Sequence, residues 1–177
     1  MNTYDLSRIS VLIVEKHPPM RTMLRQVLKE FGVEKVYDAP TPERGFEEFN
    51  ESNPDLVLVD WAPDFDGLSL VRDIRTHEDS IFRQVPVIMV TAYNESNHIY
   101  EALDAGMTEY LSKPVSAKLL YLRMASVIEN KRRFIRAGEF IGPDRRRRQN
   151  AFGGPDRRGD FEEPRHPSPG GNRIAAA

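Results

Sequence analysis

The sequence contains no cysteine, a single tryptophan and little net charge, −2 at pH 7 over 177 residues. The absence of cysteine excludes disulfides and thiolate metal sites, and it fits a reducing compartment. No apolar run approaches the roughly 18 residues that a membrane span requires. The N-terminus also lacks a basic region followed by an apolar segment. We therefore expect a soluble, cytoplasmic protein.

The small net charge hides an uneven distribution of charged residues. Residues 131–177 hold 12 Lys and Arg against 6 Asp and Glu, whereas residues 1–130 hold 13 against 21. An acidic body with a basic C-terminal segment indicates that this segment meets an anion while the body has another role.

Apolar runs of strand length alternate with segments of helical period over most of the chain. The expected strands are residues 9–14, 33–39, 55–60, 85–90 and 108–112. The expected helices are residues 20–32, 41–52, 67–78, 94–105 and 116–136. Continuous apolar runs are typical of parallel strands covered on both faces. The alternation predicts an α/β fold, a doubly wound five-stranded parallel sheet with right-handed crossovers.

The alternating pattern stops beyond residue 137. The segment that follows is rich in Gly, Pro and Arg and poor in aliphatic residues, so it cannot bury enough apolar surface to fold alone. We therefore divide the chain into a domain at 1–130 and a segment at 131–177. The latter comprises the end of the last helix and a largely disordered basic tail that orders on a ligand.

Polar residues follow several of the predicted strands. They are Glu15, Lys16, Asp60, Thr91 and Lys113. In doubly wound sheets, ligands bind outside the carboxyl ends of the strands. These side chains are therefore expected to converge on one cleft.

Six motifs at these strand ends resemble the receiver domain of bacterial response regulators, the CheY-like, flavodoxin-like (βα)5 family. They are "VLIVEKHPPMRTMLRQVL", "PDLVLVD", "DG" at 66–67, "PVIMVTA", "DAG" at 104–106 and "YLSKP". The resemblance covers roughly residues 8–130. It implies that Asp60 accepts a phosphoryl group, that Thr91 and Lys113-Pro114 contact the phosphoryl oxygens, and that Tyr110 moves on activation. It also implies an Mg²⁺ site beside Asp60, where two acids follow the first strand.

The sequence departs from the family at two points of this site. Lys16 stands in place of the second acid, and the loop "DWAPDFDG" is one residue shorter than usual. Mg²⁺ prefers hard oxygen ligands, so we expect at most weak binding, through Glu15 and Asp60. Two interpretations stay open: a phosphorylated switch, or a scaffold in which Lys16 and Lys113 pair with Asp60. His17 has no partner at metal-ligand spacing, and we interpret it as a loop residue at a helix start.

The basic tail contains the motif Phe-x-Gly-Pro-Asp-Arg-Arg twice, twelve residues apart. Guanine accepts an Arg fork at O6 and N7 and donates from N1 and N2 to a carboxylate, so an Asp-Arg unit complements it. An adjacent arginine can reach a phosphate, and Phe140 or Phe152 can cover a purine face. Two such units match cyclic di-GMP. The resemblance of this tail to that of the Cle class of CheY-like proteins implies the contacts Asp144, Arg145, Arg146, Arg147, Arg148, Asp156, Arg157 and Arg158.

A receiver domain followed by an arginine-rich stretch resembles the Cle class of CheY-like proteins. That resemblance implies cyclic di-GMP as ligand and the flagellar motor switch as partner, bound through the fourth helix, fifth strand and fifth helix. It is also compatible with recruitment to the flagellated pole. Arg132 and Arg136 lie four residues apart, and we expect them on one face of the last helix, as further ligand contacts or as an ordinary helix end.

The sequence thus supports two hypotheses. In the first, the chain is a non-enzymatic signalling adapter that binds cyclic di-GMP. In the second, it is a phosphorylation-dependent response regulator whose basic tail binds nucleic acid or acidic surfaces without reading guanine.

Overall fold

The computed structural model describes residues 4–93, 95–129, 132–138, 140–144 and 159–160. Of the disordered tail predicted beyond residue 137, residues 139, 145–158 and 161–177 lie outside the described residues, whereas 140–143 and 159–160 form strands. None of the helices in the described part of the chain is both long and apolar enough to cross a membrane.

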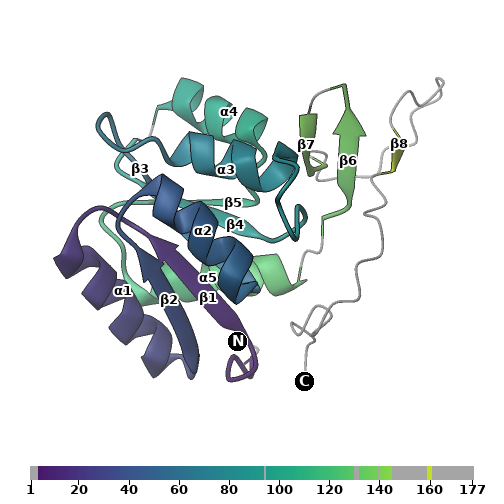
Figure 1. Ribbon diagram of the computed structural model, residues 1–177. Helices are drawn as coiled ribbons and strands as arrows, with labels where there is room; N and C mark the ends of the chain where they lie inside the picture. Colours follow the sequence, from purple (N-terminus) through teal and green to yellow (C-terminus); the bar gives the residue numbers. More distant parts are fainter. Residues whose placement is uncertain (1–3, 94, 130–131, 139, 145–158, 161–177) are drawn as a thin grey trace.

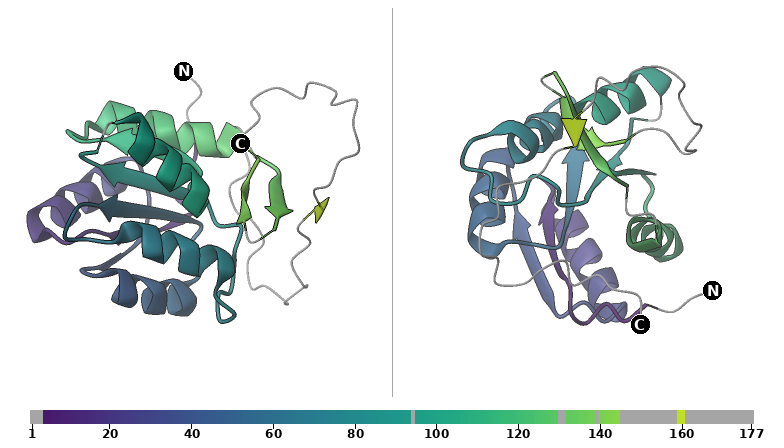
Figure 2. Two further views of the ribbon diagram at one scale, coloured as in Figure 1. Left: turned by 90° about the horizontal axis from the view of Figure 1, so that it is seen from above. Right: turned by 90° about the vertical axis from the view of Figure 1, so that its right-hand side faces the viewer.

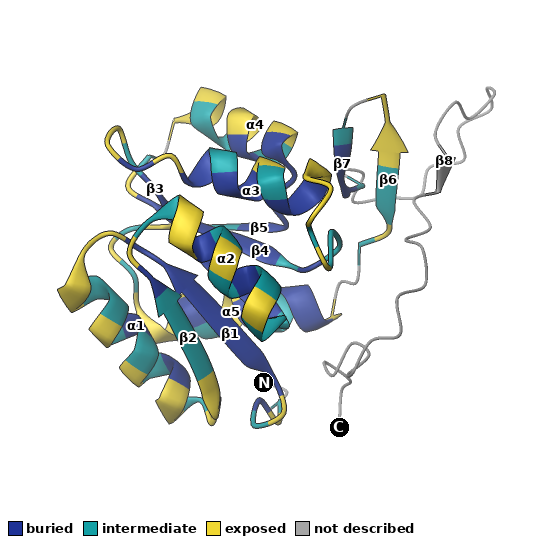
Figure 3. Cartoon of the chain, viewed as in Figure 1, coloured by how far each residue is buried: buried dark blue, intermediate teal, exposed yellow. Residues whose placement is uncertain are grey.

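Five parallel strands form the central sheet, in the order β2-β1-β3-β4-β5. Their bounds are β1 Ser10–Val14, β2 Lys35–Ala39, β3 Leu56–Trp61, β4 Val87–Thr91 and β5 Glu109–Ser112. The three central strands β1, β3 and β4 are buried along their whole length (Figure 3). This confirms the interpretation of continuous apolar runs as strands covered on both faces.

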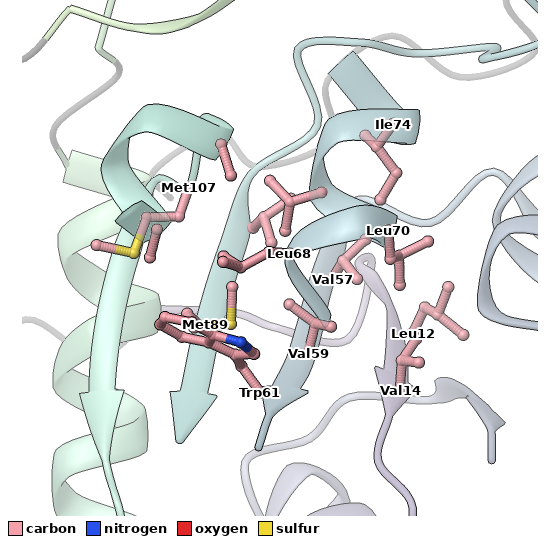
Figure 4. Packing of buried hydrophobic residues seen from close by; sticks show 14 of the residues in the cluster. Leu12, Val14, Val57, Val59, Trp61, Leu68, Leu70, Ile74, Met89 and Met107 are labelled. Atoms are coloured by element: carbon pink, nitrogen blue, oxygen red, sulfur yellow. The ribbon is translucent and has the colours of Figure 1, made fainter. Parts of the chain in front are cut away.

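Five helices cover the two faces of the sheet (Figure 1). They are α1 Pro18–Glu30, α2 Pro42–Ser52, α3 Gly67–Thr76, α4 Ser96–Ala105 and α5 Ala117–Glu129. Alternate residues of each strand enter two separate cores. Val57 and Val59 of β3 pack with α2, α3 and α4, whereas Leu58 packs with α1 and α5. Figure 4 shows the first core, with Trp61 and Met89 at its centre. The doubly wound fold is therefore confirmed.

Local sequence signals set the helix ends. The Thr41 side chain accepts a hydrogen bond from the Arg44 amide, 3.3 Å, and Pro42 occupies the first helical turn, as predicted. Gly106 ends α4 in the left-handed region, with φ of 97°.

The chain after α5 differs from the prediction. The helix ends at Glu129 instead of continuing to residue 136, and an antiparallel hairpin follows, with strands β6 Phe134–Ala137 and β7 Phe140–Pro143. The segment "FIRA" alternates apolar and polar residues poorly, and the four-residue spacing of Arg132 and Arg136 does not reflect a helix. A short strand β8, Gly159–Asp160, pairs with β6.

The hairpin lies beyond the amino ends of β4 and β5, away from the strand ends where ligands bind in this fold (Figures 1 and 2). Ile141 is buried, and β7 contacts α3 and α4. Gly106 allows this approach, because a Cβ there would lie 2.9 Å from the Ile141 carbonyl oxygen. Described strands thus also occur in the segment 131–177, at 134–137, 140–143 and 159–160.

Candidate functional site

Three of the predicted polar residues meet at the carboxyl ends of β1, β3 and β5. Glu15 follows β1, Asp60 belongs to β3 and Lys113 follows β5. The side chains of both acids are only 2% exposed. Parallel strands end at the same edge of the sheet, which explains why residues 98 positions apart in sequence become neighbours.

Lys113 joins the two buried carboxylates. Its Nζ lies 2.8 Å from Glu15 Oε2 and 2.9 Å from Asp60 Oδ1. Each carboxylate thus has a cationic partner, but the group as a whole holds two negative charges against one positive charge. Burying charge is costly unless it is compensated, so a further cation at this edge of the sheet would lower that cost.

Lys16 does not belong to this cluster. Its ammonium group pairs with Asp64 in the exposed loop after β3. The prediction that Lys16 pairs with Asp60 was therefore wrong. A long, flexible side chain at the rim reaches an exposed carboxylate without giving up its hydration, whereas reaching Asp60 would bury its charge.

His17 borders the cluster from the solvent side. It is the N-cap residue of α1, which confirms its interpretation as a residue at a helix start. Its ring is 63% exposed. Its amide donates to Glu15 Oε1 over 2.9 Å, and its Nδ1 lies 2.9 Å from the same oxygen. Glu15, His17 and Asp60 form a group of potential metal ligands whose donor atoms all lie within 4.8 Å of one another.

The loop after Asp60 closes in a tight turn. The Ala62 amide donates to the Phe65 carbonyl over 3.1 Å, and the Phe65 amide donates to the Ala62 carbonyl over 2.9 Å. This turn accommodates the missing residue of the loop. It also engages the backbone carbonyl oxygens of Ala62 and Phe65 in hydrogen bonds.

Thr91 and Tyr110 occupy the positions that the resemblance assigns to switching. The Thr91 hydroxyl is buried and donates to the Trp61 carbonyl. The Tyr110 hydroxyl is buried without a hydrogen-bond partner among the described residues, and burial raises the pKa of Tyr110. Both side chains are therefore turned inward.

An aromatic group that could not be predicted from the sequence covers the neighbouring rim. The Tyr93 and His98 rings stack with centroids 4.1 Å apart, and the His98 ring meets Trp61 edge-on at 5.3 Å. Trp61 adjoins Asp60 and is the only tryptophan in the chain. Its fluorescence therefore reports on this site.

The ionisation of the cluster follows from burial and its ion pairs. Burial raises the pKa of Asp60; the hydrogen bond from Lys113 partly opposes this, and the charge of Glu15 adds to it. Burial also acts to raise the pKa of Glu15, but hydrogen bonds from Lys113 and His17 outweigh it and lower the pKa. For Lys113, burial acts to lower the pKa, and hydrogen bonds to Glu15 and Asp60 outweigh it and raise the pKa.

Comparison with known families agrees with this geometry. The model of the response regulator receiver domain matches residues 11–125, which include Glu15, Asp60, Thr91 and Lys113. This chain belongs to the response regulator receiver family.

The receiver domain has relatives of two kinds. It is 39% identical over 116 residues to the KDP operon transcriptional regulatory protein KdpE of Escherichia coli, covering 65% of this chain and 49% of that protein. It is 30% identical over 122 residues to the chemotaxis protein CheY1 of Helicobacter pylori, covering 68% of this chain and 97% of that protein. The chain thus spans about half the length of the transcriptional regulators it matches, and its receiver domain matches nearly all of CheY1.

Solved structures share the receiver fold. The chemotaxis protein CheY4 of Vibrio cholerae superposes with a TM-score of 0.61 at 22% identity, over 67% of this chain and 98% of that one. At this identity the likeness concerns the fold alone.

Receiver domains commonly bind Mg²⁺ through acidic residues, and Glu15 and Asp60 are the acids at this position. The donor set fits that ion poorly. Lys16 supplies an ammonium group where the family has an acid, and the third nearby donor is an imidazole, which Mg²⁺ seldom accepts.

The residues predicted to contact cyclic di-GMP are described only in part. Arg145, Arg146, Arg147, Arg148, Phe152, Asp156, Arg157 and Arg158 lie outside the described residues. The Asp144 amide donates to the Arg133 carbonyl over 2.8 Å. Arg132 and Arg136 do not share a helix face as predicted, because Arg132 follows α5 and Arg136 belongs to β6. Arg132 lies 3.4 Å from Glu109 on β5.

Sequence reasoning missed Arg75, whose side chain fastens the hairpin to the domain. Arg75 is 1% exposed; its Nε donates to the Gly106 carbonyl over 3.0 Å, and its guanidinium lies 5.0 Å from the centre of the Phe134 ring. Its position could have indicated this role. Arg75 follows Ile74 on the apolar face of α3, and a charged residue is rarely buried there unless its charge has a partner.

Proposed function

We propose that this chain is a non-enzymatic signalling adapter. Its arginine-rich tail binds cyclic di-GMP, and the bound tail changes the affinity of the receiver domain for a protein partner, the flagellar motor switch. The proposal joins the family membership, the chemotaxis relatives and the repeated Asp-Arg unit of the tail.

The observation that carries the proposal is the attachment of the tail to the hairpin. The first Asp-Arg unit begins at Asp144, whose amide is fixed to the Arg133 carbonyl at the base of β6. A ligand held by that unit therefore acts on a segment packed against the receiver domain, and its effects do not have to cross a flexible linker.

The hairpin offers two routes into the domain. Ile141 and Gly142 are buried against the end of α4, where Gly142 approaches Gly106 closely. Arg132, just before the hairpin, pairs with the buried Glu109 of β5. A ligand shifts a conformational equilibrium only through contacts that differ between the two states. These contacts can transmit such a difference to β5 and α4.

The chemistry of the tail supports a ligand with two guanines and two phosphates. Each Asp-Arg unit offers a carboxylate for guanine N1 and N2 and a guanidinium for O6 and N7. In this proposal Asp144 and Asp156 read the two bases, and the remaining arginines hold phosphates.

The surface proposed for the partner is formed by α4, the edge strand β5 and α5. Large apolar side chains are exposed on both flanking helices: Tyr100 is 63% exposed, Leu119 42% and Leu122 41%. Exposed apolar groups of this size mark interaction surfaces when they gather on one side. The family resemblance names the motor switch as the protein that binds there.

Isothermal titration of cyclic di-GMP into the full chain tests the proposal. Asp144→Ala and Asp156→Ala should each weaken binding about tenfold, the loss of roughly one charged hydrogen-bonded contact. Asp64→Ala, which removes an aspartate remote from the tail, serves as the matched control and should bind normally. Cyclic di-AMP should compete poorly.

Two results would contradict the reading of guanine by aspartate. One is unchanged or tighter binding after Asp144→Ala and Asp156→Ala. The other is a steep fall of binding with salt combined with indifference to the base, which is typical of contacts to phosphate alone.

A second candidate function is phosphorylation-dependent signalling, and the geometry of Lys113 favours it. Its contacts with Glu15 and Asp60 place a cation where a phosphoryl group on Asp60 would need one. If Asp60→Asn abolishes signalling in cells while tail variants signal normally, this second function is the correct one, and the tail binds nucleic acid or acidic surfaces instead.

A further inference from the structure

The pocket at the carboxyl edge of the sheet has a donor set that differs from the one the receiver family uses for Mg²⁺. Its potential ligands are the carboxylates of Glu15 and Asp60 and the imidazole of His17. The acid expected next to Glu15 is replaced by Lys16, which points to Asp64. Compared with the family's site, this donor set has one carboxylate fewer and one imidazole nitrogen more.

The spacing of these donors suits a single ion. His17 Nδ1 and Glu15 Oε1 are 2.9 Å apart. Two neighbouring ligands of an octahedral ion with bonds of about 2.1 Å are separated by about 3.0 Å. Asp60 completes the group, since its carboxylate lies within 4.8 Å of the other two donors.

Only one of the two carboxylate oxygens of Asp60 is engaged by protein donors among the described residues. Its Oδ1 accepts from the Trp61 amide at 2.8 Å and contacts Lys113 at 2.9 Å, whereas no donor among the described residues contacts Oδ2. The side chain is only 2% exposed. Oδ2 is thus not engaged by a donor of the described residues, and a cation between Oδ2, Glu15 and His17 would use it as a ligand.

We propose that Glu15, His17 and Asp60 bind a divalent transition-metal ion in preference to Mg²⁺. Imidazole nitrogen suits Co²⁺, Ni²⁺ and Zn²⁺, whereas Mg²⁺ requires oxygen and holds its waters. His17 supplies the ligand that makes the difference, and its exposed ring leaves the ion open to solvent and to further ligands. The site is independent of the ligand of the tail.

Titration of the untagged full chain with CoCl₂ and with MgCl₂ tests this site. Binding is followed by calorimetry and by Trp61 fluorescence, which paramagnetic Co²⁺ quenches from the adjoining Asp60. Co²⁺ should bind at least about tenfold more tightly than Mg²⁺. His17→Ala should weaken Co²⁺ binding about tenfold or more and change Mg²⁺ binding less than about twofold.

His77→Ala is the matched control. His77 is also exposed and next to an acid, with its Nδ1 3.6 Å from Asp79, but it lies outside the cluster. His17→Ala should fold normally, because His17 makes no side-chain capping hydrogen bond to α1. The proposal fails if Mg²⁺ binds more tightly than Co²⁺, if His17→Ala binds Co²⁺ normally, or if His77→Ala loses as much affinity as His17→Ala.

Discussion

The two ends of the central sheet are held together by different kinds of contact. At the carboxyl ends, three charged side chains from separate strands, Glu15, Asp60 and Lys113, meet in a buried ionic group. At the amino ends, the β6-β7 hairpin packs against the domain through the buried Ile141, the close approach of Gly106 to the Ile141 carbonyl, and the contact of Arg75 with the Phe134 ring.

The difference separates what the chain shares with its family from what it adds. The ionic group lies within the segment that matches the receiver family, whereas the hairpin follows the end of the match at residue 125. Protonation or a bound ion changes the charge of an ionic group and therefore its stability. The position of a hairpin held by steric fit changes instead when a ligand binds to the segment attached to it. Substitutions at each end should therefore have distinct signatures.

Arg75→Leu should produce the largest loss of stability. Arg75 donates to the carbonyls of Gly106 and Arg83, at 3.0 and 2.6 Å, and its substitution leaves one buried and one partly buried acceptor unmet. We expect a loss of about 4 kcal/mol in the free energy of unfolding, since hydrogen bonds from a charged group contribute about 1.5–3 kcal/mol each. Urea unfolding followed by circular dichroism measures it. The exposed neighbour Arg72→Leu should lose less than about 0.5 kcal/mol. Equal effects would mean that the hydrogen bonds from Arg75 to Gly106 and Arg83 do not stabilise the domain.

Lys113→Met should cost about 3 kcal/mol at pH 7, because it leaves Glu15 and Asp60 buried without a cation. The raised pKa of Lys113 means that its own contribution is fully present at pH 7 and is lost only above its usual titration range.

The cost of Lys113→Met should also depend on pH. Without Lys113 the pKa values of both carboxyl groups rise, and protonation relieves their repulsion as the pH falls. The difference in unfolding free energy between the variant and the wild type should therefore shrink from pH 7 to pH 5. The same difference at both pH values would show that the ionic group contributes little to the carboxyl edge.

Gly106→Ala should cost about 2 kcal/mol, and Gly138→Ala about 1 kcal/mol. Both glycines have positive φ, 97° and 64°, where an L-residue loses about 1–2 kcal/mol. Only at Gly106 would the new Cβ also press on the Ile141 carbonyl oxygen, at 2.9 Å; nothing lies within 4 Å at Gly138. Thermal unfolding of the two variants isolates the packing of the hairpin. A larger loss of stability for Gly138→Ala would show that the close approach of Gly106 to Ile141 does not hold the hairpin.

Lys16→Ala should have the smallest effect, below about 0.5 kcal/mol. Its ion pair with Asp64 is exposed, with 44% and 65% of the two side chains accessible, and exposed pairs contribute little. Urea unfolding of Lys16→Ala beside Asp64→Ala checks this. A loss of several kcal/mol would mean that Lys16 pairs with Asp60 in solution after all.

The carboxyl end was the more predictable of the two. Buried parallel strands appear as apolar runs, and the residue after each run must lie at one edge of the sheet, so Glu15, Asp60 and Lys113 could be brought together from the sequence. The partner of Lys16 could not be predicted from the sequence, because a flexible side chain has several partners within reach and solvation decides among them.

The amino end could not be predicted in the same way. Residues 134–143 contain few aliphatic residues and no alternating pattern, so nothing local distinguishes their strands from a tail. The hairpin is stable through contacts with Arg75 and Gly106, which lie 59 and 28 positions before Phe134. Such long-range contacts leave little trace in local periodicity.

Amide resonances of the isotope-labelled full chain, followed during titration with cyclic di-GMP, show whether the bound tail acts on the receiver domain through the hairpin. We expect shifts at Gly106 and in the hairpin, residues 134–143, with much smaller shifts at Trp61 and Thr91 of the ionic end. Shifts confined to the ionic end, or no shifts with excess ligand, would contradict this expectation.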